Sequence, residues 1–311
     1  IADGKKILVL MNPPYAEAAV ADNTATGEDN SENKLGVSKT KVAKLMDNQG
    51  YAARELFVQF LVRIAKEIPT ATLAMFSKLK YVNAPNFEKF RQDWNAKYLG
   101  GFVVHSKSFD GLKGDFPIGF LVWKTDLNAT NKQPIVEITT DVLDKNTRPI
   151  GEKHFYNLPN EKLLSNWIKR TKSNDVDALP LKNAFSPTTS TKDVRGTKWA
   201  NGAIGGMICK GSDLQNAANA TAIMSSGYCS AGGFLVTDKN LWQSAIVFTV
   251  RRIIKQTWLN DRDQFLQPTE PLTDEFKNDC LIWMLFNGSN LTASANDLEW
   301  NGKKWSIVNH F

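Results

Sequence analysis

One short stretch near the start of the chain restricts its fold more than any other. The apolar run from Ile7 to Met11 leads directly into Asn12-Pro13-Pro14-Tyr15. A short apolar run that stops at prolines is typical of a buried parallel strand, because each proline fixes φ and lacks a backbone N–H. In open α/β sheets, ligands bind where such strands end. The stretch therefore predicts an α/β fold that displays a turn at the carboxyl end of a strand.

The groups in this turn suit one kind of chemistry. Asn12 adds a side-chain carbonyl, the prolines stiffen the turn and present mainly backbone carbonyls, and Tyr15 adds an aromatic face. Acceptors on both hydrogens of a ring-conjugated amino group localise its lone pair for attack on a methyl donor, while a stacking ring holds a base flipped out of the duplex. The alternative is an ordinary proline turn after a strand.

The stretch resembles motif IV of the amino-group DNA methyltransferases, above all the adenine-specific enzymes, in which Asn-Pro-Pro-Tyr is the catalytic signature. The resemblance implies a catalytic turn of Asn12, Pro13, Pro14 and Tyr15. Asn12 and the Pro13 carbonyl would hold the amino group, and Tyr15 would stack on the base. The same four residue types occur in methyltransferases that act on protein glutamine or on RNA, so the motif alone leaves these substrates open.

The residues after the turn predict further elements of an α/β fold. Apolar residues at helical spacing predict an amphipathic helix from Tyr51 to Ile68, which Pro69 stops, and residues 72–76 predict the next strand. This order is a βαβ unit with parallel strands. We further expect a polar turn over 77–84, a helix over 86–98 that Gly100-Gly101 ends, and strands over 102–105 and 116–123.

This order of elements extends the resemblance. The segment from Ser108 to Gly119 looks like motif VIII of the same family, a hairpin whose aromatic residue packs on the flipped base opposite the motif IV tyrosine. Phe109 is the first choice for that role and Phe116 the second, and the alternative is a phenylalanine of the core. We interpret residues 1–130 as the second half of a methyltransferase catalytic core. It would be partly Rossmann-like, with a mostly parallel sheet, helices and an antiparallel last strand.

The sequence shows no clear counterpart of the half of the catalytic core that binds the methyl donor. In this family a glycine-rich motif I cradles S-adenosylmethionine, which is the cofactor that the resemblance implies. The glycine clusters at 202–206 and 226–233 follow no clear strand with an acidic residue behind it, so we interpret both as loop turns. Only six residues precede Ile7, and we expect the donor-binding half upstream in a longer chain or on another polypeptide. The chain alone should be inactive.

Residues 131–311 are expected to form an α+β C-terminal region that takes part in recognising the DNA target. Strands are predicted over 135–143 and 233–236, and helices over 161–169, 241–258 and 276–286. The window from Lys145 to Lys210 holds 12 Lys and Arg against 5 Asp and Glu, in a chain of net charge +6. Basic residues mixed with Trp167, Phe185 and Trp199 suit contact with DNA. A solvated lysine-rich surface is the alternative.

Composition narrows the class of protein. The 311 residues are 42% hydrophobic and 23% charged, which is ordinary for a globular protein, and no apolar run approaches the roughly 18 residues of a membrane span. The cysteines Cys209, Cys229 and Cys280 lie far apart, so we expect neither a disulfide framework nor a zinc site, and a cytoplasmic location. Asp261 with Asp263 lacks a third ligand, so no metal site is predicted.

Together these observations predict the target-base half of an adenine-specific DNA methyltransferase from a restriction-modification system, which uses S-adenosylmethionine and acts on DNA. The rival hypothesis is a non-catalytic DNA-binding or assembly subunit that keeps the methyltransferase half-fold.

Overall fold

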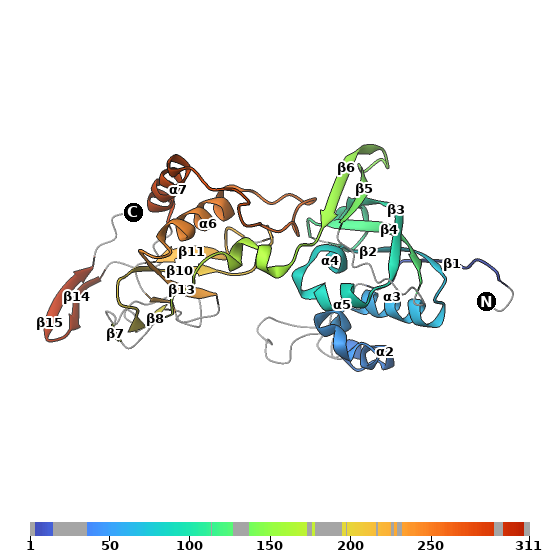
Figure 1. Ribbon diagram of the computed structural model, residues 1–311, viewed down its shortest axis with the longest axis horizontal. Helices are drawn as coiled ribbons and strands as arrows, with labels where there is room; N and C mark the ends of the chain where they lie inside the picture. The colour runs from blue at the N-terminus through green and yellow to red at the C-terminus, as the bar shows by residue number, and fades with distance from the viewer. Residues whose placement is uncertain are drawn as a thin grey trace. The chain divides into compact units, whose positions relative to one another are not determined.

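The structure is a computed structural model that describes residues 4–14, 36–112, 114–126, 137–172, 176–177, 195–196, 198–215, 217–224, 227–228, 232–288 and 295–307. The chain divides into two compact units (Figure 1). The first comprises Ile1–Pro159 and Thr257–Asp263, and the second comprises Asn160–Gln256 and Gln264–Phe311.

A six-stranded sheet forms the first unit, with its strands in the spatial order β1-β2-β4-β3-β5-β6. The strands are β1 (Leu8–Met11), β2 (Thr72–Lys78), β3 (Ala96–His105), β4 (Pro117–Thr125), β5 (Glu137–Leu143) and β6 (Pro149–Tyr156). The helices are α2 (Lys41–Lys44), α3 (Leu56–Glu67), α4 (Lys80–Asn83) and α5 (Glu88–Asp93), with 3-10 turns η1 (Asp47–Arg54), η2 (Pro85–Phe87) and η3 (Ser106–Ser108).

The directions of the strands confirm the predicted fold class. β1 pairs in parallel with β2, and β3 with β5, whereas β4 is antiparallel to both of its neighbours and β6 is antiparallel to β5. β1, β2, β3 and β5 therefore point one way. The unit β1-α3-β2 is the expected βαβ unit, and β4 is the expected antiparallel strand. The first unit is thus a Rossmann-like α/β sheet.

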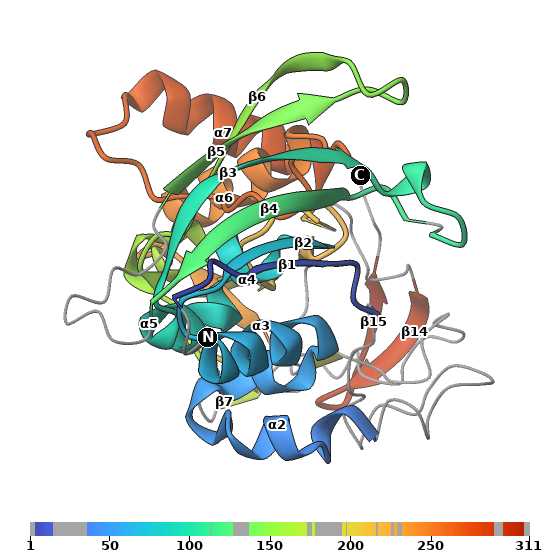
Figure 2. The ribbon, with the colours of Figure 1, turned by 90° about the vertical axis from the view of Figure 1, so that its right-hand side faces the viewer.

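One face of this sheet is covered by helices, and the other face is partly open at β1. Val9 and Met11 pack against the core beneath the sheet, which includes buried residues of α3. Figure 2 draws α3 and α5 on one side of the strands. Leu8 and Leu10 alternate with Val9 and Met11 and are 65% and 68% exposed. The prediction of a buried strand is therefore right for one face of β1 and wrong for the other.

Two local predictions in the first unit are wrong. The helix expected over 86–98 ends at Asp93, because residues from Ala96 onward pair with β4, and Gly100 and Gly101 lie inside β3. The polar turn expected over 77–84 contains the end of β2 and helix α4, where Tyr81 is fully buried.

The first unit is completed by a segment that lies far along the chain. The Trp258 ring lies 5.1 Å from the His105 ring between centroids, and Asp263 forms an ion pair with Lys153 on β6. Strand β6 continues the sheet to Tyr156 and the unit extends to Pro159, which is past the division expected at residue 130.

The second unit has the α+β character predicted for the C-terminal region. Its strands are β7 (Val176–Asp177), β8 (Arg195–Gly196), β9 (Lys198–Trp199), β10 (Ala203–Cys209), β11 (Thr221–Met224), β12 (Gly227–Tyr228), β13 (Gly233–Thr237), β14 (Ala295–Trp300) and β15 (Lys303–Ile307). Its helices are α6 (Leu241–Ile253) and α7 (Asp274–Asn287), with 3-10 turns η4 (Asn160–Lys162) and η5 (Leu164–Asn166).

The antiparallel sheet β11-β10-β13 and helices α6 and α7 enclose the core of the second unit. The Phe248 and Trp283 rings, one from each helix, lie 5.8 Å apart between centroids. The helix predicted over 161–169 is replaced by η4 and η5, and α6 ends at Ile253 rather than at Trp258. Among the helices described here, none has both the length and the apolar character needed to cross a membrane.

Candidate functional site

The turn that follows β1 lies at the carboxyl edge of the first sheet. β1 ends at Met11, which pairs with Met75, so Asn12 lies one residue beyond this pair. Asn12 and Pro14 are exposed and Pro13 is buried. Tyr15 lies outside the described residues. The turn therefore has one proline anchored in the protein and presents its asparagine to solvent.

Other segments end at the same edge, because β1, β2 and β3 run in one direction. β2 ends at Lys78 and β3 at His105, and the antiparallel β4 begins there with Pro117. The loop between β3 and β4, residues 106–116, contains both aromatic residues predicted for the motif VIII role. The fold thus brings Asn12, Pro13 and this loop to one edge of the sheet.

Phe109 joins a cluster of aromatic rings at this edge, which we call the Phe76 cluster. The Phe109 ring meets the Phe76 ring edge-on at 5.4 Å between centroids. Phe76 also contacts Phe120 at 4.7 Å and Phe102 at 6.1 Å, and all four rings are half-buried. Half-buried rings keep a partly exposed aromatic surface on which a planar ligand can stack.

Phe116, the second choice, has a different environment. Its ring centroid lies 5.8 Å from the Lys78 ammonium, which is a cation–π contact. Its backbone carbonyl accepts a hydrogen bond of 2.9 Å from the Ser106 N–H, which closes the loop. Phe109 belongs to a half-buried group of rings that a planar base could contact, whereas the Phe116 ring lies against Lys78. Phe109 therefore remains the first choice for stacking on the base.

Polar contacts that sequence reasoning missed also hold this loop. Asp115 accepts from the Lys107 ammonium at 2.6 Å and lies 3.2 Å from Nε2 of His105. Lys107 keeps the pKa of the Asp115 carboxyl below its usual value, chiefly through their hydrogen bond. The His105 ring in turn packs on Trp258. Trp258 is about 150 residues away from His105 in sequence, so the local spacing of apolar residues cannot predict this contact.

The described residues provide neither a metal site nor a cradle for the methyl donor. They contain no group of three or more His, Cys, Asp or Glu side chains that could hold a metal ion. Gly205 and Gly206 lie inside β10, an antiparallel strand of the second unit, and Gly232 lies in the turn before β13. A donor-binding loop would follow a parallel strand and open a helix. The glycines described here do not fit that arrangement.

Comparison with known proteins gives little further information. No family model and no curated protein matches the chain. One similar solved structure is the ATP-dependent Type ISP restriction-modification enzyme LlaBIII bound to DNA, at 11% identity and a TM-score of 0.29, over 65% of this chain and 14% of that chain. Another is a cryo-EM structure of a DrdV–DNA complex, at 13% identity and a TM-score of 0.24, over 49% of this chain and 14% of that chain. The chain spans about a seventh of either protein, and a likeness this weak supports no conclusion about function.

Proposed function

We propose that this chain carries the target-base half of an adenine-specific DNA methyltransferase of a restriction-modification system. The reaction would transfer a methyl group from S-adenosylmethionine to the exocyclic amino group of adenine. The observation that carries the proposal is the position of Asn12-Pro13-Pro14 directly after a parallel strand, at the sheet edge that also holds Phe109. Ligands of open α/β sheets bind at this edge.

The residues of the turn have distinct roles in this proposal. The exposed Asn12 side chain and the backbone carbonyl of Pro13 accept hydrogen bonds from the two amino hydrogens of the base. These bonds draw the nitrogen out of conjugation with the ring, so its lone pair becomes available for attack. Tyr15 and Phe109 stack on the extruded adenine. The edge-on contact of Phe109 with Phe76 helps to hold its ring in place.

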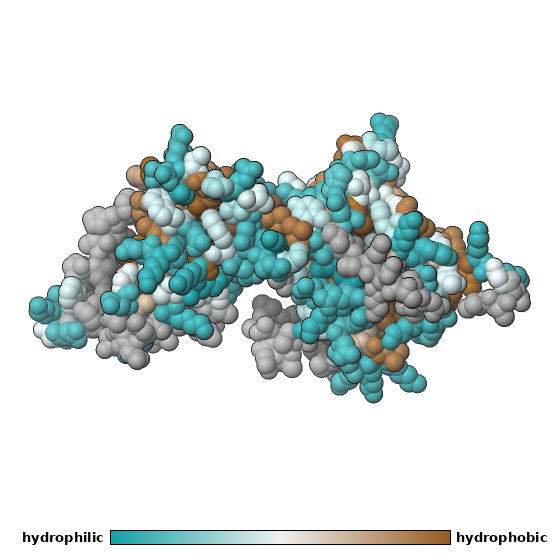
Figure 3. All heavy atoms as spheres, in the orientation of Figure 1, coloured by the Kyte–Doolittle hydropathy of each residue, from teal (hydrophilic) through white to brown (hydrophobic). Residues whose placement is uncertain are grey.

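We propose that a separate half of the enzyme, upstream in a longer chain or on another polypeptide, holds the donor. The residues described here do not form that site, and no step of the reaction is assigned to it. The edge strand β1 offers a surface on which such a half could pack. Leu8 and Leu10 expose an apolar strip there, and hydrophobic atoms are visible at the surface where Figure 1 draws β1 (Figure 3). A sheet edge with exposed leucines favours pairing with a further strand.

The test uses Asn12→Ala in the natural assembly, purified through a tag on this chain so that any polypeptide that supplies the donor half is retained. We expect the wild-type assembly to label adenine in DNA from tritiated S-adenosylmethionine. The variant should lose about 100- to 1000-fold in rate, as when one hydrogen bond to a transition state is removed. Asn86→Ala, which changes an exposed asparagine elsewhere in the first unit, is the control and should not alter the rate.

Each other outcome has a defined meaning. An assembly that binds DNA but transfers no methyl group contradicts the proposal and favours the non-catalytic DNA-binding or assembly subunit. If RNA or a protein glutamine is labelled and DNA is not, the proposed role of Asn12 stands and the proposed substrate changes.

A further inference from the structure

Two cavities in the second unit share parts of their walls, because different residues of the segments 167–171 and 237–246 line each of them. Residues 268–277 complete the wall of one cavity, and residues 201–202 complete the wall of the other. The first cavity, which we call the tryptophan pocket, has a volume of 260 Å³ and is lined by Trp167, Trp242 and Gln243 among others. The second, which we call the basic pocket, has a volume of 380 Å³ and is lined by Lys169, Arg170, Thr237 and Lys239 among others.

A buried asparagine holds the two segments together. Asn240, only 1% exposed, accepts a 2.9 Å hydrogen bond from the backbone N–H of Thr237. Its side-chain amide donates to the carbonyls of Lys169 at 2.9 Å and Leu235 at 3.0 Å. Leu235 also donates its N–H to the Thr171 carbonyl at 2.8 Å. These bonds fix Lys169, Thr171 and Thr237 of the basic pocket before any ligand binds, which lowers the entropy cost of binding there.

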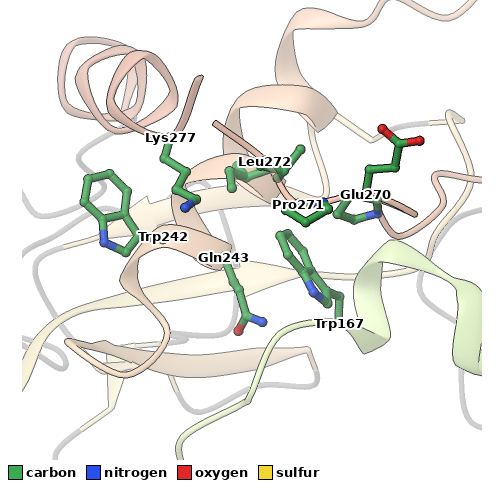
Figure 4. A pocket seen from close by; sticks show the side chains of 9 residues that line it. Trp167, Trp242, Gln243, Glu270, Pro271, Leu272 and Lys277 are labelled. Carbon is green, nitrogen blue, oxygen red and sulfur yellow. The ribbon is translucent and has the colours of Figure 1, made fainter. Parts of the chain in front are cut away.

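The tryptophan pocket offers two indole rings and few polar groups. Figure 4 shows Trp242 and Trp167 on two sides of the pocket, with Gln243 and Lys277 between them in this view. The carboxylate of Glu270 points away from both indoles in the same view. Trp242 is 39% exposed, so part of its ring surface is open to a ligand. Indole faces bind planar rings by stacking, and the Gln243 amide can both donate and accept at the edge of such a ring.

The volume of the tryptophan pocket limits its occupant. At 260 Å³ it is smaller than the roughly 300–1,000 Å³ of pockets that take drug-sized ligands. A single planar ring system is the size that it accommodates. A proline-rich peptide uses a longer groove lined by aromatic residues, so it fits this pocket less well.

The basic pocket carries an excess of positive charge. Lys169, Arg170 and Lys239 outnumber the one carboxylate in its lining, Asp238. The guanidinium of Arg170 donates to the carbonyls of Gly232, Ser165 and Cys209, which are neutral, so these bonds do not cancel its charge.

Thr237 adds an independent sign that a ligand binds in the basic pocket. The residue is 6% exposed, and its Oγ1 has no hydrogen-bond partner among the described residues. A buried hydroxyl without a partner is costly, and an anionic oxygen in the pocket would accept its proton.

From this arrangement we infer that the two pockets together bind one unpaired nucleotide of DNA. The base stacks in the tryptophan pocket beside Trp242, and its phosphate lies in the basic pocket near Lys169 and Lys239. Proteins that hold single-stranded nucleic acid combine positive charge along the backbone with aromatic side chains on which bases stack. This site lies in the second unit and is separate from Asn12. The inference rests on the proposed function only in taking DNA as the partner.

The test measures binding of a fluorescein-labelled single-stranded oligodeoxynucleotide to the full chain without any methyl donor. Trp242→Ala should weaken binding by roughly 5- to 150-fold, the range found when one stacked base loses its aromatic partner. Trp305→Ala is a matched control, because Trp305 is 40% exposed on β15 and does not line the pocket. That control should bind as the wild type does.

A second pair of variants tests the phosphate part of the site. Lys239→Met should weaken binding and reduce the slope of log affinity against log salt by about one unit. Lys303→Met, an exposed lysine of β15, should leave the slope unchanged. This pair keeps the inference testable if Trp242→Ala fails to fold. Circular dichroism of each variant shows whether it has folded.

Three results would overturn the inference. The first is equal binding of the single strand by Trp242→Ala and Trp305→Ala, and the second is equal binding of a fully paired duplex with the same dependence on Trp242. The third is equal quenching of tryptophan fluorescence by deoxyadenosine monophosphate and by deoxyribose 5-phosphate, which lacks the base. Tighter binding of the matching RNA oligonucleotide would replace DNA with RNA. Asn12→Ala should bind the single strand normally, so failure of the proposed function and failure of this inference are distinguishable.

Discussion

At the scale of single residues, Asn12 and Phe109 reach the same edge of the sheet in different ways. Asn12 follows β1 directly, so its position depends on the pairing of Met11 with Met75. Phe109 lies in a loop, where its backbone N–H donates to the Ser106 carbonyl at 3.0 Å and its ring rests on Phe76. Neither strand pairing depends on the Phe109 ring. Its substitution removes this ring contact and any stacking on a ligand, but leaves the strand pairing in place.

We predict that Phe109→Ala in the natural assembly weakens productive binding of DNA by roughly 5- to 150-fold, because one stacking partner of the extruded base is lost. The measurement is the rate of methyl transfer against DNA concentration. Phe276→Ala, which changes a 40% exposed phenylalanine on α7, is the control and should leave the rate unchanged. A Phe109→Ala assembly with the wild-type rate would leave Phe109 with a packing role only.

At the scale of elements, the close approach of β3 and β4 depends on a glycine. Gly101 pairs with Leu121, and a Cβ added to it would lie 2.3 Å from the Phe120 carbonyl oxygen. Both glycines have a positive φ, +158° at Gly101 and +136° at its neighbour Gly100, but a Cβ at Gly100 would meet no atom within 4 Å. The two glycines therefore separate the cost of close packing from the cost of an unusual backbone angle.

We predict that Gly101→Ala lowers the free energy of unfolding by about 1–3 kcal/mol more than Gly100→Ala does, because overpacking forces the backbone of β4 to shift. Chemical denaturation followed by circular dichroism measures both values. Hydrogen exchange in peptides of β3 and β4 should show the loss of protection at this strand pair. Equal destabilisation by the two variants would mean that β4 moves away without cost.

At the scale of the whole molecule, β1 is an edge strand of the first sheet and exposes two leucines, which is where we propose that a further element packs. Leu8 and Leu10 are among the most exposed large apolar residues of the described chain. Exposed apolar strips on sheet edges favour association. The donor-binding half that we propose would bury this strip and extend the sheet.

We predict that Leu10→Lys prevents assembly with the donor-binding half and abolishes methyl transfer, because a lysine ammonium cannot be buried there without a partner. Leu10 is 68% exposed, so the change should alter the stability of the chain by no more than about 0.5 kcal/mol. Size-exclusion chromatography with light scattering detects the assembly. Leu45→Lys, at a 59% exposed leucine away from the sheet, is the control. A Leu10→Lys chain that still assembles would contradict the prediction.

Local sequence patterns predicted the elements whose stability comes from their own periodicity. The apolar run before Asn12 predicted β1, and the spacing of Phe57, Leu61 and Ala65 predicted α3, because a strand or an amphipathic helix repeats with a fixed period. The proposed roles of Asn12 and Phe109 come from the motifs and stay predictions.

Only the tertiary structure decided features that depend on distant partners. Residues 96–98 continue the aromatic spacing of a helix, yet they form β3, because pairing with β4 and contact of the Tyr98 ring with Trp123 outweigh local propensity. The return of Trp258 to the first unit and the grouping of Trp167 with Trp242 likewise join residues far apart in sequence. Apolar residues in a strand predict burial, but whether anything covers Leu10 depends on which element packs over that face of the sheet.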